Sequence, residues 1–139
     1  MAMILVIDDE ESIRFTFERF LRGQGYTVLC AVSCREALAK LTECNPDVIV
    51  ADIVLEDGLG IDILRETRQK AINAPVIMIT GDPNVDTAME SVRLGAFDYL
   101  PKPVTEESLL RIIGNALRYK NLFDEKERLR TNLEAIFRS

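Results

Sequence analysis

The sequence predicts an α/β fold in which five strands alternate with five helices, (βα)5, around one parallel sheet. Two observations lead to this prediction. Short apolar segments rich in β-branched residues alternate with longer segments of helical periodicity, and glycine or proline follows several of the longer ones. The 139 residues are enough for one well-buried domain and too few for two comfortable ones.

Each predicted strand is a short, continuous apolar segment, which is typical of a strand buried on both faces of a parallel sheet. The five segments are Ile4–Ile7, Thr27–Ala31, Val48–Ala51, Val76–Ile79 and the shorter Phe97–Leu100.

The segments between the strands place apolar residues three or four positions apart, on one face of a helix. The five sets are Ile13, Phe17, Phe20 and Leu21; Ala37, Leu38 and Leu41; Ile61 and Leu64, with the polar Arg68; Val85, Ala88, Met89 and Val92; and Leu109, Ile112, Ile113, Ala116 and Leu117. Ser33 and Thr105 fall at predicted N-caps, and Gly95 ends the fourth helix. Right-handed crossovers would place these helices on both faces of the sheet.

The fifth helix is predicted to continue to the end of the chain, because after Thr105 only Gly114 interrupts good helix formers. An imperfect heptad pattern runs through Tyr119, Leu122, Lys126, Leu129, Leu133 and Ile136. It fits pairing with a second copy, and it fits a solvated linker helix equally well. We expect residues 1–119 to form the domain and residues 120–139 a helical linker to an output or sensor module outside this chain.

Composition excludes several functions. The formal net charge of −6 disfavours direct binding to nucleic acid, and the apolar segments are too short to cross a membrane. The chain has no histidine, which excludes a histidine base or zinc site within it. We expect a cytoplasmic protein with reduced cysteines at Cys30, Cys34 and Cys44, of which Cys34 should react most readily.

Polar residues follow the apolar segments where the strands should end. They are Asp8, Asp9, Glu10, Asp52, Thr80 and Lys102. The carboxyl ends of parallel strands share one edge of the sheet, so we expect these residues to meet there. The clustered carboxylates would repel one another unless a cation such as Mg²⁺ were bound. Asp52 could then attack a phosphoryl group, with Lys102 and Thr80 binding its oxygens.

Each of these residues also has a simpler explanation. Asp8 and Asp9 fit an acidic helix N-terminus, Asp52 fits a turn, and Lys102 fits a solvated surface lysine. Their joint placement at the ends of different predicted strands favours a site.

Four segments resemble the motifs of two-component response-regulator receiver domains. They are Ile4–Glu10, Val48–Ile53, Val76–Gly81 and Gly95–Pro103. The resemblance covers residues 3–119 and implies a flavodoxin-like fold with strand order 2-1-3-4-5. It also implies a phosphoryl group donated by a phosphohistidine of a sensor histidine kinase.

By this resemblance Asp52 is the phosphoacceptor, and Thr80 and Lys102 contact the phosphoryl group. The implied cofactor is Mg²⁺, bound by Asp52, directly by Asp9, mainly through water by Asp8, and by the Val54 carbonyl. Such a domain is not an enzyme, although it assists its own phosphorylation and dephosphorylation.

The chain departs from the family pattern after the phosphoacceptor. The usual proline four residues later is replaced by Glu56, followed by Asp57, while the expected glycine is present at Gly60. We expect this loop to be more acidic and more mobile, with an altered phosphoryl lifetime, and Glu56→Pro should change the dephosphorylation rate.

The resemblance also implies how the signal leaves the site. Thr80 would move toward the phosphoryl group and Tyr99 would fill the vacated space, so that the face formed by residues 84–119 switches. Tyr99 could instead be an ordinary half-buried aromatic residue. We expect a homodimer through this face, through the C-terminal helix, or through both.

The segment Gly95–Pro103 also resembles receivers of sigma-54-dependent transcriptional regulators, and Leu133–Ser139 resembles the start of a sensor (PAS) module. A phosphorelay or PAS-linked receiver without direct transcriptional output is therefore an alternative. An Mg²⁺-dependent aspartyl-phosphate phosphatase is disfavoured, because Val54 stands where its second aspartate is needed. A flavin-binding flavodoxin is disfavoured by the acidic residues after the first strand. A degenerate receiver would lack at least one key residue, and none is missing.

Overall fold

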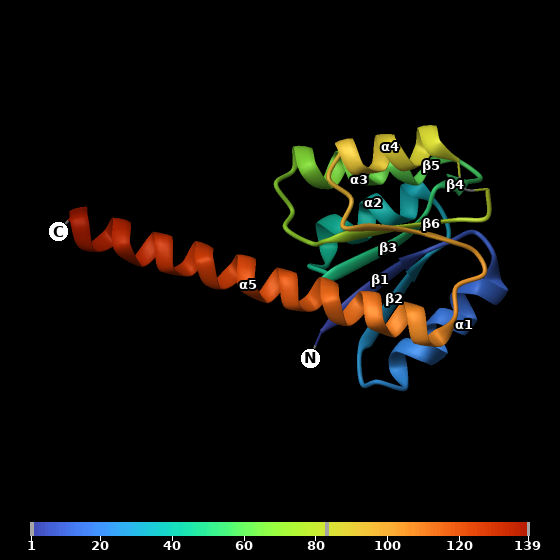
Figure 1. Ribbon diagram of the computed structural model, residues 1–139, viewed down its shortest axis with the longest axis horizontal. Helices are drawn as coiled ribbons and strands as arrows, with labels where there is room; N and C mark the ends of the chain where they lie inside the picture. Colours follow the sequence, from blue (N-terminus) through green and yellow to red (C-terminus); the bar gives the residue numbers. More distant parts are fainter. Residues whose placement is uncertain (1, 83, 139) are drawn as a thin grey trace.

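The computed structural model describes residues 2–82 and 84–138 and contains a central sheet of five parallel strands (Figure 1). The strands are β1 (Met3–Ile7), β2 (Thr27–Ala31), β3 (Val48–Asp52), β6 (Val76–Thr80) and β7 (Asp98–Pro101). Their order across the sheet, β2-β1-β3-β6-β7, confirms the predicted order of the five strands. Each strand lies within one residue of its predicted bounds.

Five helices cover the two faces of this sheet. They are α1 (Glu11–Arg22), α2 (Cys34–Glu43), α3 (Gly60–Gln69), α4 (Val85–Arg93) and α5 (Glu106–Arg138). Figure 1 shows α2, α3 and α4 on one side of the sheet and α1 and α5 on the other. The predicted (βα)5 arrangement is therefore confirmed.

Alternation along the strands divides the core into two apolar clusters. Ile4 of β1 belongs to the cluster that includes Phe17 of α1 and Ile113 of α5. The next residue, Leu5, belongs to the cluster that includes Leu64 of α3 on the opposite face. All five side chains are at most 3% exposed, and burial of each contributes about 1.5–3 kcal/mol of transfer free energy. Apolar side chains thus pack on both faces of the sheet, and this packing fixes the positions of the carboxyl ends of its strands.

Both predicted N-caps are confirmed. The Glu36 amide donates to Ser33 Oγ at 3.1 Å, and the Ser108 amide donates to Thr105 Oγ1 at 3.1 Å. Gly95, just after α4, has φ +88°, a backbone conformation that residues with a Cβ rarely adopt.

The apolar periodicity of α4 does not mark a buried face. Met89 and Val92 are 65% and 72% exposed, whereas Ser91 is fully buried and Ala88 is half-buried. The side chain of Val85 lies outside the described part of the structure. The helix itself was predicted, but its small residues, rather than its large apolar ones, face the body of the domain.

The last helix is continuous from Glu106 to Arg138, as predicted. Its 33 residues correspond to a rod of about 50 Å at 1.5 Å per residue. The first part is anchored by the buried residues Leu109, Ile112, Ile113 and Ala116. The second part projects beyond the domain (Figure 1) and exposes the apolar residues Leu122, Leu129, Leu133, Ile136 and Phe137. Among the described residues, no helix has both the length and the apolar composition that a membrane crossing requires.

A small antiparallel hairpin that we did not predict follows β3. Its strands are β4 (Val54–Leu55) and β5 (Gly58–Leu59), paired Val54 with Leu59 and Leu55 with Gly58. Glu56 and Asp57 form the connection between them, which we call the hairpin tip.

Candidate functional site

The structure brings together three of the predicted charged residues at the carboxyl edge of the sheet. Lys102 Nζ lies 2.8 Å from Asp52 Oδ2 and 3.1 Å from Asp8 Oδ2. Asp8 and Asp52 are only 2% and 6% exposed. Both carboxylates are therefore removed from water and share one ammonium group.

The strands explain this convergence. Asp8 directly follows β1, and its amide donates to the Ala31 carbonyl at the end of β2. Asp52 ends β3, and Lys102 follows β7, with its amide donating to the Thr80 carbonyl at 2.7 Å. The Lys102–Pro103 peptide bond is cis.

Burial and charge act in opposite directions on the ionisable groups of the site. Burial raises the pKa of Asp8, although the Glu10 amide and Lys102 partly offset this effect. Burial alone would lower the pKa of Lys102, but hydrogen bonds to Asp52 and Asp8 more than compensate, so its pKa is raised. Lys102 therefore keeps its positive charge at physiological pH.

The acidic residues after β1 have the donor set that a hard cation needs. Carboxylate oxygens of Asp8, Asp9 and Glu10 all lie within 4.8 Å of one another. Asp9 is half-buried and Glu10 is exposed, so the cluster opens toward solvent. Oxygen ligands of this kind, completed by water, are those that Mg²⁺ prefers. The residues present thus fit a magnesium ion.

Thr80 and Tyr99, the two predicted switch residues, have different partners in the structure. Thr80 is 2% exposed, and its Oγ1 accepts a hydrogen bond from the Asp82 amide at 3.1 Å. Tyr99 is half-buried, and its hydroxyl lies 3.2 Å from Thr87 Oγ1 of α4. Tyr99 therefore links β7 to α4 in this structure.

Two residues near the site were given no role from the sequence. Arg14 of α1 donates from Nη1 to the Asp8 carbonyl at 2.8 Å. This hydrogen bond attaches the acidic segment after β1 to α1. Gly60 is so close to the phosphoacceptor strand that a Cβ there would lie 2.1 Å from the Asp52 carbonyl oxygen. A basic residue about one turn into the first helix was a weak signal for Arg14.

The segment after Asp52, for which we expect a mobile loop, contains a paired hairpin in the structure. The Val54 amide donates to Asp52 Oδ1 at 3.1 Å, and the Gly60 amide donates to the Ile53 carbonyl at 2.7 Å. The segment between them is the β4–β5 hairpin, so it is paired internally and attached at its base.

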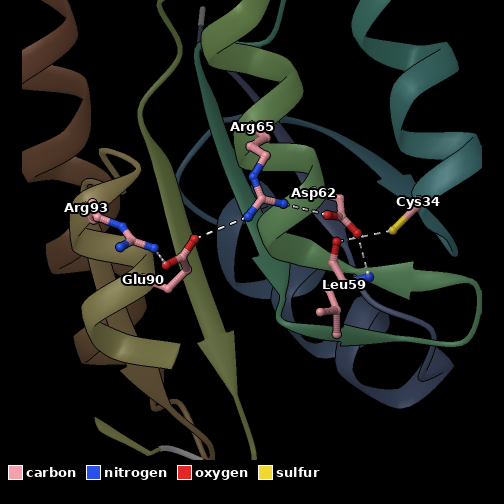
Figure 2. A network of polar contacts seen from close by, with 6 residues as sticks. All are labelled: Cys34, Leu59, Asp62, Arg65, Glu90 and Arg93. Atoms are coloured by element: carbon pink, nitrogen blue, oxygen red, sulfur yellow. Dashed lines mark hydrogen bonds and ion pairs between the residues drawn. The ribbon is translucent and has the colours of Figure 1, made fainter. Parts of the chain in front are cut away.

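The expectation that Cys34 is the most reactive cysteine is wrong. Cys34 is only 9% exposed, and its thiol lies 3.5 Å from the Leu59 carbonyl (Figure 2). Burial, together with the negative charges of Asp57 and Asp62, raises the pKa of this thiol to about 11. Little thiolate therefore exists at neutral pH.

A hollow of about 520 Å³ lies at the opposite edge of the sheet, between the start of β7 and the outer part of α5. Its described lining includes Arg68, Phe97, Tyr119 and Phe123, and no carboxylate is among the described lining residues. The chemistry of the acidic site does not extend to it.

Fold and site together define a class of protein. In a doubly wound α/β domain, charged ligands bind where the strand order reverses, here between β1 and β3, the strands that carry Asp8 and Asp52. The family model of the response regulator receiver domain matches residues 4–114. The chain belongs to this family.

Known proteins agree with this assignment. Regulatory protein AtoC of Escherichia coli (strain K12) is 36% identical over 122 residues, which cover 88% of this chain and 26% of AtoC. A response regulator receiver domain protein from Clostridium thermocellum has a TM-score of 0.83 at 41% identity, covering 88% of this chain and 99% of that one. The beryllofluoride-activated NtrC4 receiver domain dimer has a TM-score of 0.82 at 36% identity, covering 86% and 99%. The chain spans about a quarter of the length of AtoC.

Proposed function

We propose that this chain switches by accepting a phosphoryl group on Asp52. The contact that supports the proposal best is that of Lys102 Nζ, which lies 2.8 Å from Asp52 Oδ2 and 3.1 Å from Asp8 Oδ2. Lys102 and the Val54 amide bind different oxygens of Asp52 and so fix the plane of its carboxylate. A fixed nucleophile beside a cation suits phosphoryl transfer, in which positioning and charge dominate catalysis.

The donor in this proposal is a phosphohistidine of a partner sensor kinase. A carboxylate oxygen of Asp52 attacks the phosphorus, a P–O bond forms, and the P–N bond to the imidazole breaks. The imidazole leaves with the bonding electron pair and takes up a proton. This chain contains no histidine, so such a donor lies on another chain.

Asp8, Asp9, Asp52 and the Val54 carbonyl are the groups that would hold Mg²⁺. When bound, the ion would offset negative charge on the phosphoryl oxygens. Lys102 contributes a second positive charge to the same oxygens, and Thr80 donates a hydrogen bond to one of them. The chain acts as a phosphoacceptor that assists its own modification and its hydrolysis, rather than as an enzyme with an external product.

The switch passes through Thr80 and Tyr99. When Thr80 turns toward the phosphoryl group, Tyr99 moves into the space it leaves and loses its contact with Thr87. α4 is then less firmly tied to β7, and the face formed by residues 84–119 changes its partner contacts. A Tyr99→Phe variant with normal phosphorylation and normal output would contradict a role for the hydroxyl.

The output is transcriptional control, exerted from the cytoplasm through a module that follows the linker. The proposal assigns residues 1–119 to the receiver and residues 120–139 to the helical linker. AtoC is named a regulatory protein, and the NtrC4 receiver domain is described as a dimer when activated. Two copies of this chain pair through the face formed by residues 84–119, the exposed apolar residues of α5, or both.

One experiment tests the central claim. The protein is incubated with Mg²⁺ and acetyl phosphate, and the intact mass and modified peptide are read by mass spectrometry. We expect one phosphoryl group, located on Asp52 and absent in Asp52→Asn. A wild-type protein that remains unmodified, or an Asp52→Asn variant that is modified equally, would refute the assignment.

A further inference from the structure

The hairpin tip is tied to a helix that is distant in the sequence. The Asp57 carboxylate accepts hydrogen bonds from the backbone amides of Cys34 at 2.8 Å and Arg35 at 3.0 Å. These amides open α2, and neither has a partner within the helix. The hydrogen bonds from Cys34 and Arg35 lower the pKa of Asp57, so it is ionised at neutral pH.

Three backbone N–H groups at the start of α2 thus donate to side chains of two different residues, one local and one distant in the sequence. Ser33, the N-cap residue, binds the Glu36 amide with its own hydroxyl. Asp57 binds the other two from the β4–β5 hairpin. The local cap and the distant cap serve the same helix, but only the distant one connects it to the segment after Asp52.

The other end of the hairpin contacts Asp52 itself. Val54 pairs with Leu59 across the hairpin, and its amide donates to Asp52 Oδ1 at 3.1 Å. The hairpin tip and the Val54 amide belong to the same two-strand ladder. A displacement of the tip would therefore also move the Val54 amide, which is hydrogen-bonded to Asp52. The Cys34 thiol donates to the Leu59 carbonyl of the hairpin at 3.5 Å (Figure 2), which is a second link to α2.

We propose that Asp57 is a positioning residue, which fixes Val54 against Asp52 by holding the hairpin tip on the N-terminus of α2. This inference rests on the proposed function of Asp52. In this chain Glu56 stands in place of the proline usual in the family. Under the proposal, the charged side chain of Asp57 holds the loop in position.

The test compares Asp57→Ala with Ser33→Ala. Each variant removes acceptors from the same end of α2, so both should lower the urea midpoint of unfolding. Only Asp57→Ala should weaken Mg²⁺ binding, which calorimetry measures without any phosphoryl donor. Only this variant should also change the lifetime of phosphoryl-Asp52 relative to the wild-type protein. We expect changes of about tenfold, as when a group that orients a metal ligand is removed. Asp57→Asn keeps an acceptor oxygen and should restore part of both properties.

The outcomes separate this inference from the proposed function. If Asp57→Ala matches Ser33→Ala in both Mg²⁺ affinity and phosphoryl lifetime, Asp57 is only a helix cap and the inference is overturned. If the wild-type protein accepts no phosphoryl group, the proposed function fails. The Mg²⁺ titration then still decides whether Asp57 positions the hairpin.

Discussion

Substitution of Gly60 by alanine tests whether the backbone around Asp52 has the close packing seen in the structure. Gly60 begins α3, and an added Cβ would lie 2.1 Å from the Asp52 carbonyl oxygen and 3.0 Å from Met78 Cε. A carbon and an oxygen in contact need more than 3 Å, so β3 or α3 must shift by about 1 Å to accept the methyl group. Overpacking of this kind costs about 1–3 kcal/mol.

Helix propensity acts in the opposite direction, since alanine is favoured over glycine in a helix by up to about 1 kcal/mol. The net expectation for Gly60→Ala is a loss of about 1–2 kcal/mol in the free energy of unfolding. Gly114→Ala is the matched control, because a Cβ there meets only Arg118 Nη1 at 3.7 Å, an ordinary contact in the same kind of secondary structure. It should gain about 0.5–1 kcal/mol.

Urea unfolding followed by far-UV circular dichroism measures both changes, and the opposite signs make the comparison independent of the absolute scale. A Gly60→Ala variant that is stabilised as much as Gly114→Ala would refute the close approach of Gly60 to Asp52. Reduced Mg²⁺ binding by Gly60→Ala would show in addition that the shift reaches the site.

Three further predictions concern other parts of the molecule. Mg²⁺ at ten times its dissociation constant should stabilise the protein by about 1.4 kcal/mol in urea unfolding, and Asp9→Asn should reduce this gain; an equal gain in both proteins would remove Asp9 from the ligand set. The pKa of the Cys34 thiol is raised to about 11, so at mildly alkaline pH its alkylation should be slower than that of Cys44. The alkylation of Cys34 should accelerate as the pH approaches that value. Peptide mapping after iodoacetamide treatment measures both rates. Leu129→Glu should weaken self-association in sedimentation experiments with a phosphoryl analogue, whereas Thr131→Glu, on another face of α5, should not; equal effects would exclude a specific helix pairing.

Much of the fold was predictable because its strands are buried on both faces. A strand such as Val48–Asp52 has no exposed side that would require polar residues, so it appears in the sequence as a continuous apolar segment. The positions of Asp8, Asp52 and Lys102 followed from this, since residues that end parallel strands share one edge. Their actual contacts required the register of the sheet, which the apolar segments alone do not specify.

The features that escaped prediction depend on contacts between distant segments. Two-residue strands such as β4 and β5 are too short to show alternation, and their pairing depends on the closure of the segment between Ile53 and Gly60. In α4, periodicity revealed the helix but could not tell that Ser91, rather than Val92, faces the body of the domain. The burial of Cys34 likewise depends on the hairpin that packs against it.

The ion pairs of Lys102 are better explained by the chemistry of the site than by stability. A buried salt bridge often contributes little net free energy, because desolvation of the charges offsets their attraction. The two apolar clusters on either side of the sheet already hold the strands together, while Asp8, Asp52 and Lys102 lie at its edge. An arrangement that concentrates buried carboxylates at one edge is costly unless positive charge there offsets their repulsion. Under the proposed function, phosphorylation replaces one carboxylate charge of Asp52 with a more highly charged group. Lys102, already 2.8 Å from Asp52, is then in place to bind that group without reorganisation.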